Sequence, residues 1–353
     1  MRPICLRCRR NLEQEVPLTI GSVLREAGDT ILEGLLVCSN QECPSEYPII
    51  DGIPIILADL RAYVSHNISE IRACNDLSAT MESLLGDCCG PGSVFDVQRQ
   101  ILSGYAFDHY GDLDPDEPAE APALPGSAVR LLKEGLRTLT GSVRGPVIDI
   151  GCAVGRTSCE LAEKTGEIVL GVDLNFGMLK TAARVLRHGS VGYPRRRVGI
   201  VYDRREFPVT FNNAHKVDFW VCDAVDLPFA EATFGLAISL NVIDCVNAPI
   251  DHLGSVARIL ASGAKALVSS PYDWSGASTP LECWLGGHSQ RSESRGSSEN
   301  MLHSLLAGGT HPLAIQQLKL VSEVQGHPWS VRLHDRSFVQ YRVHTLVVEK
   351  TTK

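Results

Sequence analysis

Side chains suited to binding a nucleotide follow two apolar runs in the second half of the chain. In VIDIGCAVGR, Asp149, Gly151 and Gly155 stand where a strand passes into a helix. Glycines there let the backbone approach a ligand, and the start of the helix offers free N–H groups. Asp173 closes the next run, IVLGVD, where a carboxylate can accept both hydroxyls of a ribose. The spacing G-x-x-x-G, in place of G-x-G-x-x-G, argues against NAD.

Two more polar residues end apolar runs further along. Asp223 closes FWVCDA, where it can accept a hydrogen bond from an adenine amine, and Asn241 closes LAISLN. Ligands of open α/β sheets bind in the cleft outside the carboxyl ends of the strands. We therefore expect Asp223 and Asn241 to face one cleft together with the glycine loop.

The elements that must position these residues alternate in type. From Ser127 onward, short apolar runs alternate with helical patterns, which is typical of βαβ units and a mainly parallel sheet. The sequence thus predicts an α/β fold, a Rossmann-like sheet with helices on both faces. We expect a long hairpin-like insert from about Gly189 to Phe211 and closing strands near the end.

From about Tyr105 to its end, the chain resembles the class I S-adenosylmethionine-dependent methyltransferases. The resemblance implies that the loop residues border the methionine part of this cofactor, the acid of the second strand holds the ribose, and the acid of the third strand holds the adenine. Asn241 would sit near the transferable methyl group. The implied cofactor-binding residues are Asp149, Gly151, Cys152, Gly155, Asp173, Leu174, Asp223, Ala224 and Asn241.

Four cysteines near the N-terminus form two pairs with metal-ligand spacing. Cys5 and Cys8 are separated by two residues, and Cys38 and Cys43 by four. Four thiolates bind Zn²⁺ tetrahedrally, and such an ion replaces the core that so short a segment cannot build. We expect a structural zinc ribbon with a helix-bearing insert, IGSVLREAGDTILEG; four core thiols without a metal are the alternative.

The cysteine pairs followed by YPIIDGIPIIL resemble the small zinc-ribbon proteins that activate tRNA, rRNA and release-factor methyltransferases by binding them. The resemblance implies a protein partner through the ribbon, or a ribbon fused to its own methyltransferase. We expect a β-rich zinc-ribbon domain over 1–60, a helical connector with the exposed acidic, Pro-rich linker DPDEPAEAPALPG over 61–126, and the methyltransferase domain over 127–353.

The segments expected around the methyl acceptor resemble the methyltransferase domain that ends the ovothiol synthases. The shared features are H-Y-G at 109–111, the D-x-G-C-A-V-G-R loop, the long insert, S-P-Y-x-W with T-P and W-L-G-G, and a late arginine. The iron-dependent portion of those enzymes is absent, and Ser275–Ser278 replaces bulkier residues, which indicates a changed substrate. The resemblance implies an imidazole ring nitrogen of a histidine or thiohistidine derivative as acceptor.

Residues for that chemistry follow from the same segments. SPYDWSGASTPLECWLGG is expected to form a lid over the acceptor. Asp244 could instead cap a helix, and a late arginine is more often a surface residue. The expected catalytic residues are Asn241, Tyr272, Asp244 and His109, and the expected substrate contacts are Tyr110, Arg156, Trp274, Trp284 and Arg336.

Charge and composition limit the rival functions. The chain holds 33 Lys and Arg against 41 Asp and Glu, and its net charge of −8 disfavours a nucleic-acid partner. The basic stretch YPRRRVGIVYDRR, expected to be a solvated hairpin face, leaves an RNA-modifying methyltransferase as the alternative, and an inactive scaffold is a third. No window reaches the roughly 18 apolar residues of a membrane span, so we expect a cytoplasmic protein. The oligomeric state stays open.

Overall fold

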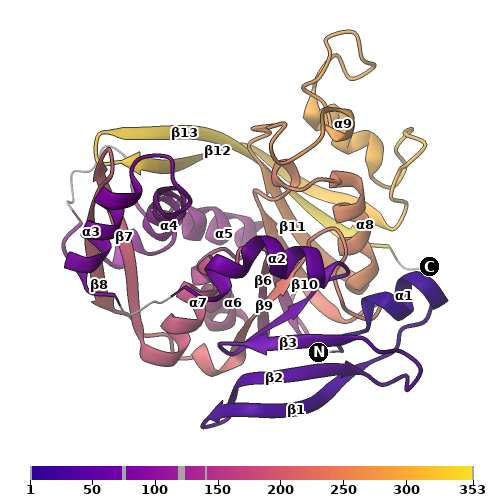
Figure 1. Ribbon diagram of the computed structural model, residues 1–353. Helices are drawn as coiled ribbons and strands as arrows, with labels where there is room; N and C mark the ends of the chain where they lie inside the picture. Colours follow the sequence, from indigo (N-terminus) through magenta and orange to yellow (C-terminus); the bar gives the residue numbers. More distant parts are fainter. Residues whose placement is uncertain (1, 74–76, 118–123, 140, 352–353) are drawn as a thin grey trace.

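The computed structural model describes the chain except for residues 1, 74–76, 118–123, 140 and 352–353. Within that part, eleven strands form one sheet in the order β1-β2-β3-β4-β9-β6-β5-β10-β11-β13-β12, and two more form the hairpin β7–β8 (Figure 1). The strands are β1 (Leu18–Ala27), β2 (Thr30–Cys38), β3 (Glu46–Ile50), β4 (Ile53–Ile56), β5 (Val147–Ile150), β6 (Val169–Asp173), β7 (Ser190–Val198), β8 (Val201–Pro208), β9 (Val217–Cys222), β10 (Phe234–Leu240), β11 (Leu260–Ser270), β12 (Leu318–His334) and β13 (Ser337–Lys350). The α-helices are α1 (Leu6–Leu12), α2 (Leu60–Ile71), α3 (Ala79–Cys89), α4 (Val94–Tyr110), α5 (Ser127–Thr138), α6 (Arg156–Thr165), α7 (Phe176–His188), α8 (Pro249–Ile259) and α9 (Ser298–Leu305).

The middle of the sheet is parallel. Strands β9, β6, β5, β10 and β11 run side by side in one direction, and β13 joins β11 antiparallel. Apolar residues of α5, α6 and α7 cover one face, and those of α8 and α9 cover the other. Strands covered on both faces need apolar residues on both sides, which explains continuous runs such as VLGV in β6. The predicted Rossmann-like α/β fold is confirmed.

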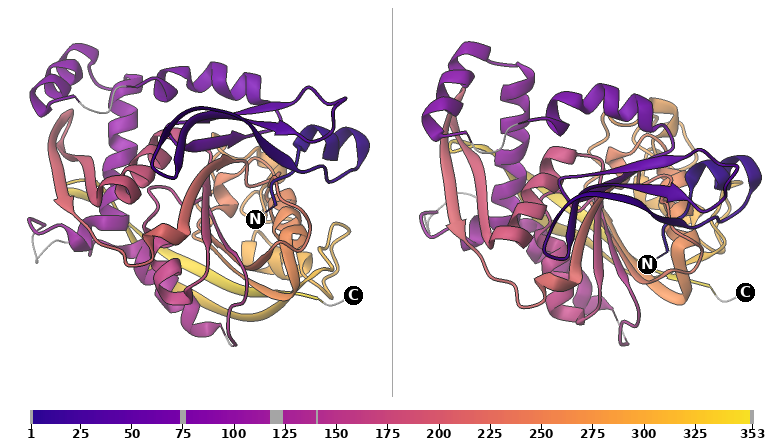
Figure 2. Two further views of the ribbon diagram at one scale, coloured as in Figure 1. Left: turned by 90° about the horizontal axis from the view of Figure 1, so that it is seen from below. Right: turned by 60° about the horizontal axis from the view of Figure 1, so that its bottom comes forward.

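The N-terminal module, α1 to β4, lies at one end of this sheet and β12 at the other (Figure 1, Figure 2). The helix-bearing insert expected between the cysteine pairs is wrong, because β1 and β2 form a hairpin there. Gly28 has a left-handed φ of 56° at the turn, and alternate residues of β2 are buried, a two-residue period that a helix lacks. Strand β4 pairs parallel with β9, so the module extends the central sheet.

Two acids at the start of the expected linker are buried, although Asp116 between them is exposed as expected. The Asp114 side chain is fully buried and pairs with Arg205 of β8. The Glu117 side chain is 5% exposed and pairs with Arg195 of β7 and Arg332 of β12. Burial of these acids against three strands fastens this part of the chain to the fold. The Pro-rich part, 118–123, lies outside the described residues.

The basic stretch at 193–205 forms the hairpin β7–β8, which stands beside α3 and α4 (Figure 2). Its arginines do not form a free basic face, because each meets a carboxylate or an amide oxygen. Arg204 pairs with Glu206 and Glu82, and Arg196 donates to Gln100. The expected hairpin is confirmed and its turn is exposed, while acids of the same chain neutralise much of this stretch.

No helix in the part of the chain that the structure describes is long and apolar enough to cross a membrane.

Candidate active site

A cavity of about 190 Å³ opens at the carboxyl ends of β5, β6, β9 and β10. This is the edge where open parallel sheets bind ligands. Several residues singled out from the sequence meet in its wall: Asp149, Gly151, Asp173, Leu174, Ala224, Asn241 and His109. We call it the first cavity.

Asp149, in β5, anchors the glycine loop to the start of α6. Its Oδ2 accepts hydrogen bonds from the hydroxyls of Thr157 and Ser158, both at 2.7 Å, and both donors lie at the start of α6. Burial raises the pKa of Asp149 to about 6, and the two hydroxyls oppose that shift. Asp149 thus connects the end of β5 to α6, and it also lines the first cavity.

Two loop residues expected at the cofactor lie away from the wall. Gly155 has a φ of 84°, and a Cβ there would come within 2.5 Å of the Phe219 ring, so packing against β9 requires a glycine. Cys152 is fully buried in the core beneath the loop. Gly151, with a φ of 73°, is the glycine that brings backbone to the cavity.

Asp173 ends β6 with both carboxylate oxygens anchored. One accepts the Ala153 N–H at 2.9 Å and the other accepts the Asn175 N–H at 2.8 Å. Each oxygen keeps a further lone pair for a ligand hydroxyl. Leu174 beside it is 45% exposed and provides an apolar surface at the cavity.

The residues at the end of the first cavity where adenine was expected to bind differ from the prediction. The Asp223 side chain caps the turn that follows β9, because its Oδ1 accepts the Val225 N–H at 3.1 Å. Asp223 does not line the first cavity. Ala224 and Cys222 line the wall instead. An Asp after a strand commonly caps the following turn, which accounts for the change.

His109 reaches the first cavity from α4. It is 5% exposed, and its Nδ1 has no hydrogen-bond partner among the described residues. Burial, followed by the nearby Arg156 charge, lowers the pKa of His109 to about 3. The ring is therefore neutral near pH 7 and available to hydrogen-bond a ligand.

A second cavity of about 350 Å³ adjoins the first, between α4, β12 and the segment after β11. The two cavities share Tyr105, Asp108, Asn241, Cys245 and Trp329. Asn241 has a φ of 57°, and its Oδ1 accepts the Ser269 hydroxyl at 2.9 Å, which fixes its amide at the junction. Asp244, expected from the sequence, lines the second cavity.

The sequence analysis missed the aromatic residues of the second cavity. Tyr105 and Trp329 line it together with Tyr341 of β13. The run YAFDHY was a local signal for Tyr105. Trp329 and Tyr341 lie far along the chain from Tyr105, and they face each other because β12 pairs with β13.

The aromatic residues of the expected lid point away from both cavities. The Tyr272 hydroxyl lies 2.6 Å from Nδ1 of His344. Trp274 stacks on Trp284 with ring centroids 6.0 Å apart, and their Nε1 atoms donate to Ser298 and to a backbone carbonyl. The chain turns at Tyr272, which has a left-handed φ of 58°, and its neighbours Pro271 and Asp273 line the second cavity instead.

Three other expected substrate contacts also lie elsewhere. Arg156 is buried and pairs with Glu160 and Asp112. The hydroxyl of Tyr110, also buried, donates to the Val154 carbonyl at 2.9 Å. Arg336 is exposed at the turn between β12 and β13. The first two brace α4 against α6 and the glycine loop.

Comparison with known proteins decides what this arrangement is. Residues 148–268 match the family model described as "Methyltransferase domain". Residues 148–268 are a methyltransferase domain. The match contains β5, the glycine loop, β6, β9, β10 and most of β11, and hence most of the wall of the first cavity.

Relatives of the methyltransferase domain are distant. An O-methyltransferase from Pyrenophora dematioidea is 23% identical over 174 residues, covering 49% of this chain and 56% of its own length. The norajmaline N-methyltransferase of Rauvolfia serpentina is 25% identical over 167 residues, covering 46% and 50%. The structure of a SAM-dependent methyltransferase from Methanosarcina mazei aligns with a TM-score of 0.40 and 18% identity, covering 62% of this chain and 97% of that one. The chain thus spans about half the length of the curated relatives cited here.

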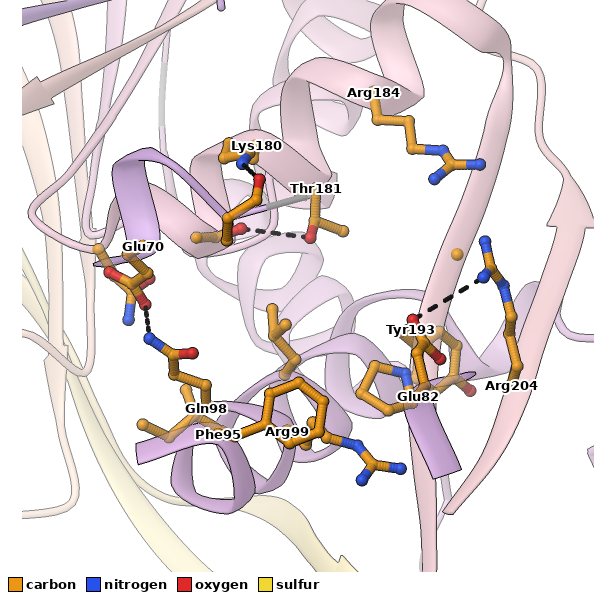
Figure 3. Close-up of a pocket in the computed structure, with 17 residues that line it drawn as sticks. Glu70, Glu82, Phe95, Gln98, Arg99, Lys180, Thr181, Arg184, Tyr193 and Arg204 are labelled. Carbon is orange, nitrogen blue, oxygen red and sulfur yellow. Dashed lines mark hydrogen bonds and ion pairs between the residues drawn. The ribbon is translucent and has the colours of Figure 1, made fainter. Parts of the chain in front are cut away.

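A third cavity, of about 190 Å³, lies beside the methyltransferase domain between α2, α4, α7 and the β7–β8 hairpin. Figure 3 shows three of its charged side chains, Glu70, Lys180 and Arg204, joined to neighbouring groups by dashed lines. Glu70 accepts a hydrogen bond from Gln98, Arg204 meets Glu82, and Lys180 donates to a backbone carbonyl. These pairs hold the helices and the hairpin together, and we assign no ligand to this cavity.

The four expected metal ligands come together in the N-terminal module. The Sγ atoms of Cys5, Cys8, Cys38 and Cys43 all lie within 4.8 Å of one another, with Cys5–Cys43 at 3.8 Å and Cys8–Cys38 at 3.6 Å. Tetrahedral zinc with Zn–S bonds of about 2.3 Å places its sulfurs at such separations, so the residues fit this ion.

His252 predicts a measurable pH effect on stability. Its Nδ1 lies 3.1 Å from the Ala224 carbonyl and its Nε2 lies 2.9 Å from the Ser239 hydroxyl, and burial lowers its pKa from 6.5 to about 4. Between these values the unfolded chain binds a proton that the folded protein does not, so this contribution to stability is lost as the pH falls. The free-energy difference between wild type and His252→Gln should therefore shrink by about 3 kcal/mol from pH 7 to pH 4.

Urea titrations of both proteins at the two pH values measure this difference. Buried carboxylates such as Asp149, whose raised pKa acts in the opposite direction, cancel in the comparison. An unchanged difference between pH 7 and pH 4 would show that His252 is protonated in the folded protein.

Proposed function

We propose that this chain is an S-adenosylmethionine-dependent methyltransferase acting on a small molecule, and that the acceptor is an imidazole ring nitrogen of a histidine or thiohistidine derivative. The observation that carries the proposal is the pair of adjoining cavities that meet at Asn241, one of them within the methyltransferase domain. Two cavities with a shared junction suit a methyl donor and a methyl acceptor.

The residues of the first cavity fit the cofactor. Asp173 keeps free lone pairs for ribose hydroxyls, and the apolar Leu174, Cys222 and Ala224 suit the faces of a purine. Gly151 presents backbone without a side chain where the amino-acid part would lie. When bound, S-adenosylmethionine supplies an electrophilic methyl group carried on a sulfonium.

The chain's own residues then need to perform little chemistry themselves. Methyl transfer is an in-line displacement, so the protein gains most by placing the nucleophile and excluding water. Asn241 stands at the junction through which the methyl must pass, and α4 contributes Tyr105 to both cavities and His109 to the first. A neutral imidazole nitrogen already has a lone pair near pH 7, so a strong base is not required.

The RNA alternative has less support. Its one basic stretch is largely paired with acids of the same chain, and the net charge is −8. Affinity for nucleic acid arises mostly from neutralising phosphates, which paired arginines do poorly.

We also propose that the cysteine cluster binds one structural Zn²⁺. Its four ligands would leave no open position for water, unlike a catalytic site. Because β4 pairs with β9, the module would support the edge of the catalytic sheet from within the same chain.

The function is tested by calorimetry and mass spectrometry. S-adenosylhomocysteine should bind the full chain, and incubation with S-adenosylmethionine should add 14 mass units to 5-mercaptohistidine or a related imidazole, a gain equal to the replacement of N–H by N–CH₃. Transfer to rRNA with none to imidazoles would favour the alternative. A folded protein that binds no S-adenosylhomocysteine would leave only the scaffold.

A further inference from the structure

More acidic than basic side chains line the second cavity. Asp108, Asp244 and Asp273 line it, and none of them forms an ion pair with a basic side chain within the described residues. Asp244 is 2% exposed, and its Oδ2 accepts the Asp273 N–H at 2.8 Å. A carboxylate in such a place is costly unless a cation or hydrogen-bond donors meet it.

The two arginines of the cavity wall are already engaged. Arg332 is 1% exposed, its Nη1 pairs with Glu117, and its guanidinium carbon lies 3.9 Å from the Phe107 ring centroid, while its Nε and Nη2 have no hydrogen-bond partner among the described residues. Arg196 donates to the Gln100 side chain and to the Gly199 carbonyl. Neither arginine neutralises Asp244 or Asp273.

Aromatic faces complete the wall. Trp329 and Tyr341 stack with ring centroids 5.2 Å apart. Each ring is held by a carboxylate, because Trp329 Nε1 donates to Asp108 at 2.7 Å and the Tyr341 hydroxyl donates to Asp273 at 2.8 Å. Aromatic faces beside unpaired carboxylates attract an organic cation.

We propose, building on the proposed function, that the methyl acceptor enters the second cavity as a cation bound by Asp244 and Asp273 against Trp329 and Tyr341. The substrate class is a protonated organic amine or basic heteroaromatic ring; phenols and acids that carry no cationic amine are excluded. Burial raises the pKa of Asp244, which suits a carboxylate that receives a proton.

The transfer step balances with these groups. An acceptor whose reacting nitrogen is protonated gives that proton to Asp244 and regains its lone pair, whereas an imidazole that is cationic at another group already has the lone pair and gives its ring N–H proton to Asp244 after methylation. That lone pair forms the N–CH₃ bond while the S–CH₃ bond breaks, and the bonding pair of the latter stays on sulfur as S-adenosylhomocysteine. The proton on Asp244 later leaves to water.

Calorimetry with histamine, which carries an ammonium group, and imidazole-4-propionate, its anionic counterpart, tests the proposal. With S-adenosylhomocysteine already bound, histamine should bind wild type at least 10-fold more tightly than imidazole-4-propionate does. Asp273→Asn keeps an acceptor for the Tyr341 hydroxyl but should weaken histamine binding at least 10-fold. Asp203→Asn, an exposed carboxylate on β8, is the control and should change nothing.

A further variant covers the case in which Asp273→Asn fails to fold. Tyr341→Phe keeps the aromatic face and should bind histamine within about 3-fold of wild type, whereas Tyr341→Leu should lose about 10-fold. The proposal is overturned if histamine fails to bind, if imidazole-4-propionate binds equally well, or if a folded Asp273→Asn or Tyr341→Leu binds histamine like wild type. Failure of the proposed function is distinct, because wild type would then either bind no S-adenosylhomocysteine or methylate rRNA and no imidazole.

Discussion

Replacing Asp173 with alanine is expected to weaken S-adenosylhomocysteine binding by about 100-fold or more, and catalysis with it. Hydrogen bonds to a charged group each contribute about 1.5–3 kcal/mol, and a ribose offers two hydroxyls to this carboxylate. Two such bonds correspond to a loss of about two to four orders of magnitude in affinity. Isothermal titration calorimetry on the purified full chain measures the change.

Asp173 also supports the loop, so this variant needs a matched comparison. Alanine leaves the N–H groups of Ala153 and Asn175 without their acceptor, whereas Asp173→Asn restores part of that support without the charge. We expect Asp173→Asn to bind with intermediate affinity, and Glu231→Ala, an exposed acid, to bind like wild type. Full affinity in a folded Asp173→Ala would remove Asp173 from the cofactor site.

Replacing Cys5 with serine is expected to release the metal and unfold the N-terminal module. Zinc binding to four thiolates contributes about 10–16 kcal/mol of folding energy in zinc-finger peptides, more than a module of this size obtains from its apolar core. Elemental analysis should show about one zinc per wild-type chain and under about 0.1 in the variant. Limited proteolysis should then cleave within β1–β3, which wild type protects.

Cys88→Ser provides the control, since Cys88 is exposed on α3 and distant in sequence from the cluster. It should retain zinc and resist the protease. A strong chelator added to wild type should reproduce the Cys5→Ser pattern. A metal-free wild-type protein with an intact, protease-resistant module would contradict the zinc proposal.

Prediction from the sequence succeeded where a pattern is local. The apolar runs ending in Asp149, Asp173 and Asn241 predicted strands of the central sheet, and the structure has those strands as β5, β6 and β10. The two-residue period of β2 was as local, but the segment was predicted to be helical together with β1, which contains helix-forming residues such as Leu24 and Arg25. Chain neighbours alone could not show that this segment would find a pairing partner.

The candidate site residues also divide into those that a local pattern predicts and those that depend on the tertiary structure. Asp173 follows its strand directly, so its position at the cavity could be inferred from the sequence. Tyr272 and Trp274 also follow a strand, yet they turn toward His344 and Trp284, while Asp273 between them reaches the second cavity. Tyr272 has a left-handed φ of 58°, and no spacing rule in the sequence specifies such a turn.

By itself, the sequence determined the central parallel sheet, the glycine loop and the two cysteine pairs, because each rests on short-range patterns of burial, turn formation or ligand spacing. Only the tertiary structure decided the second cavity. Tyr105, Asp244 and Trp329 come from segments more than 80 residues apart and meet only because β12 runs back across α4 (Figure 1). Contacts between such distant segments depend on how the whole chain packs, and no local pattern encodes them.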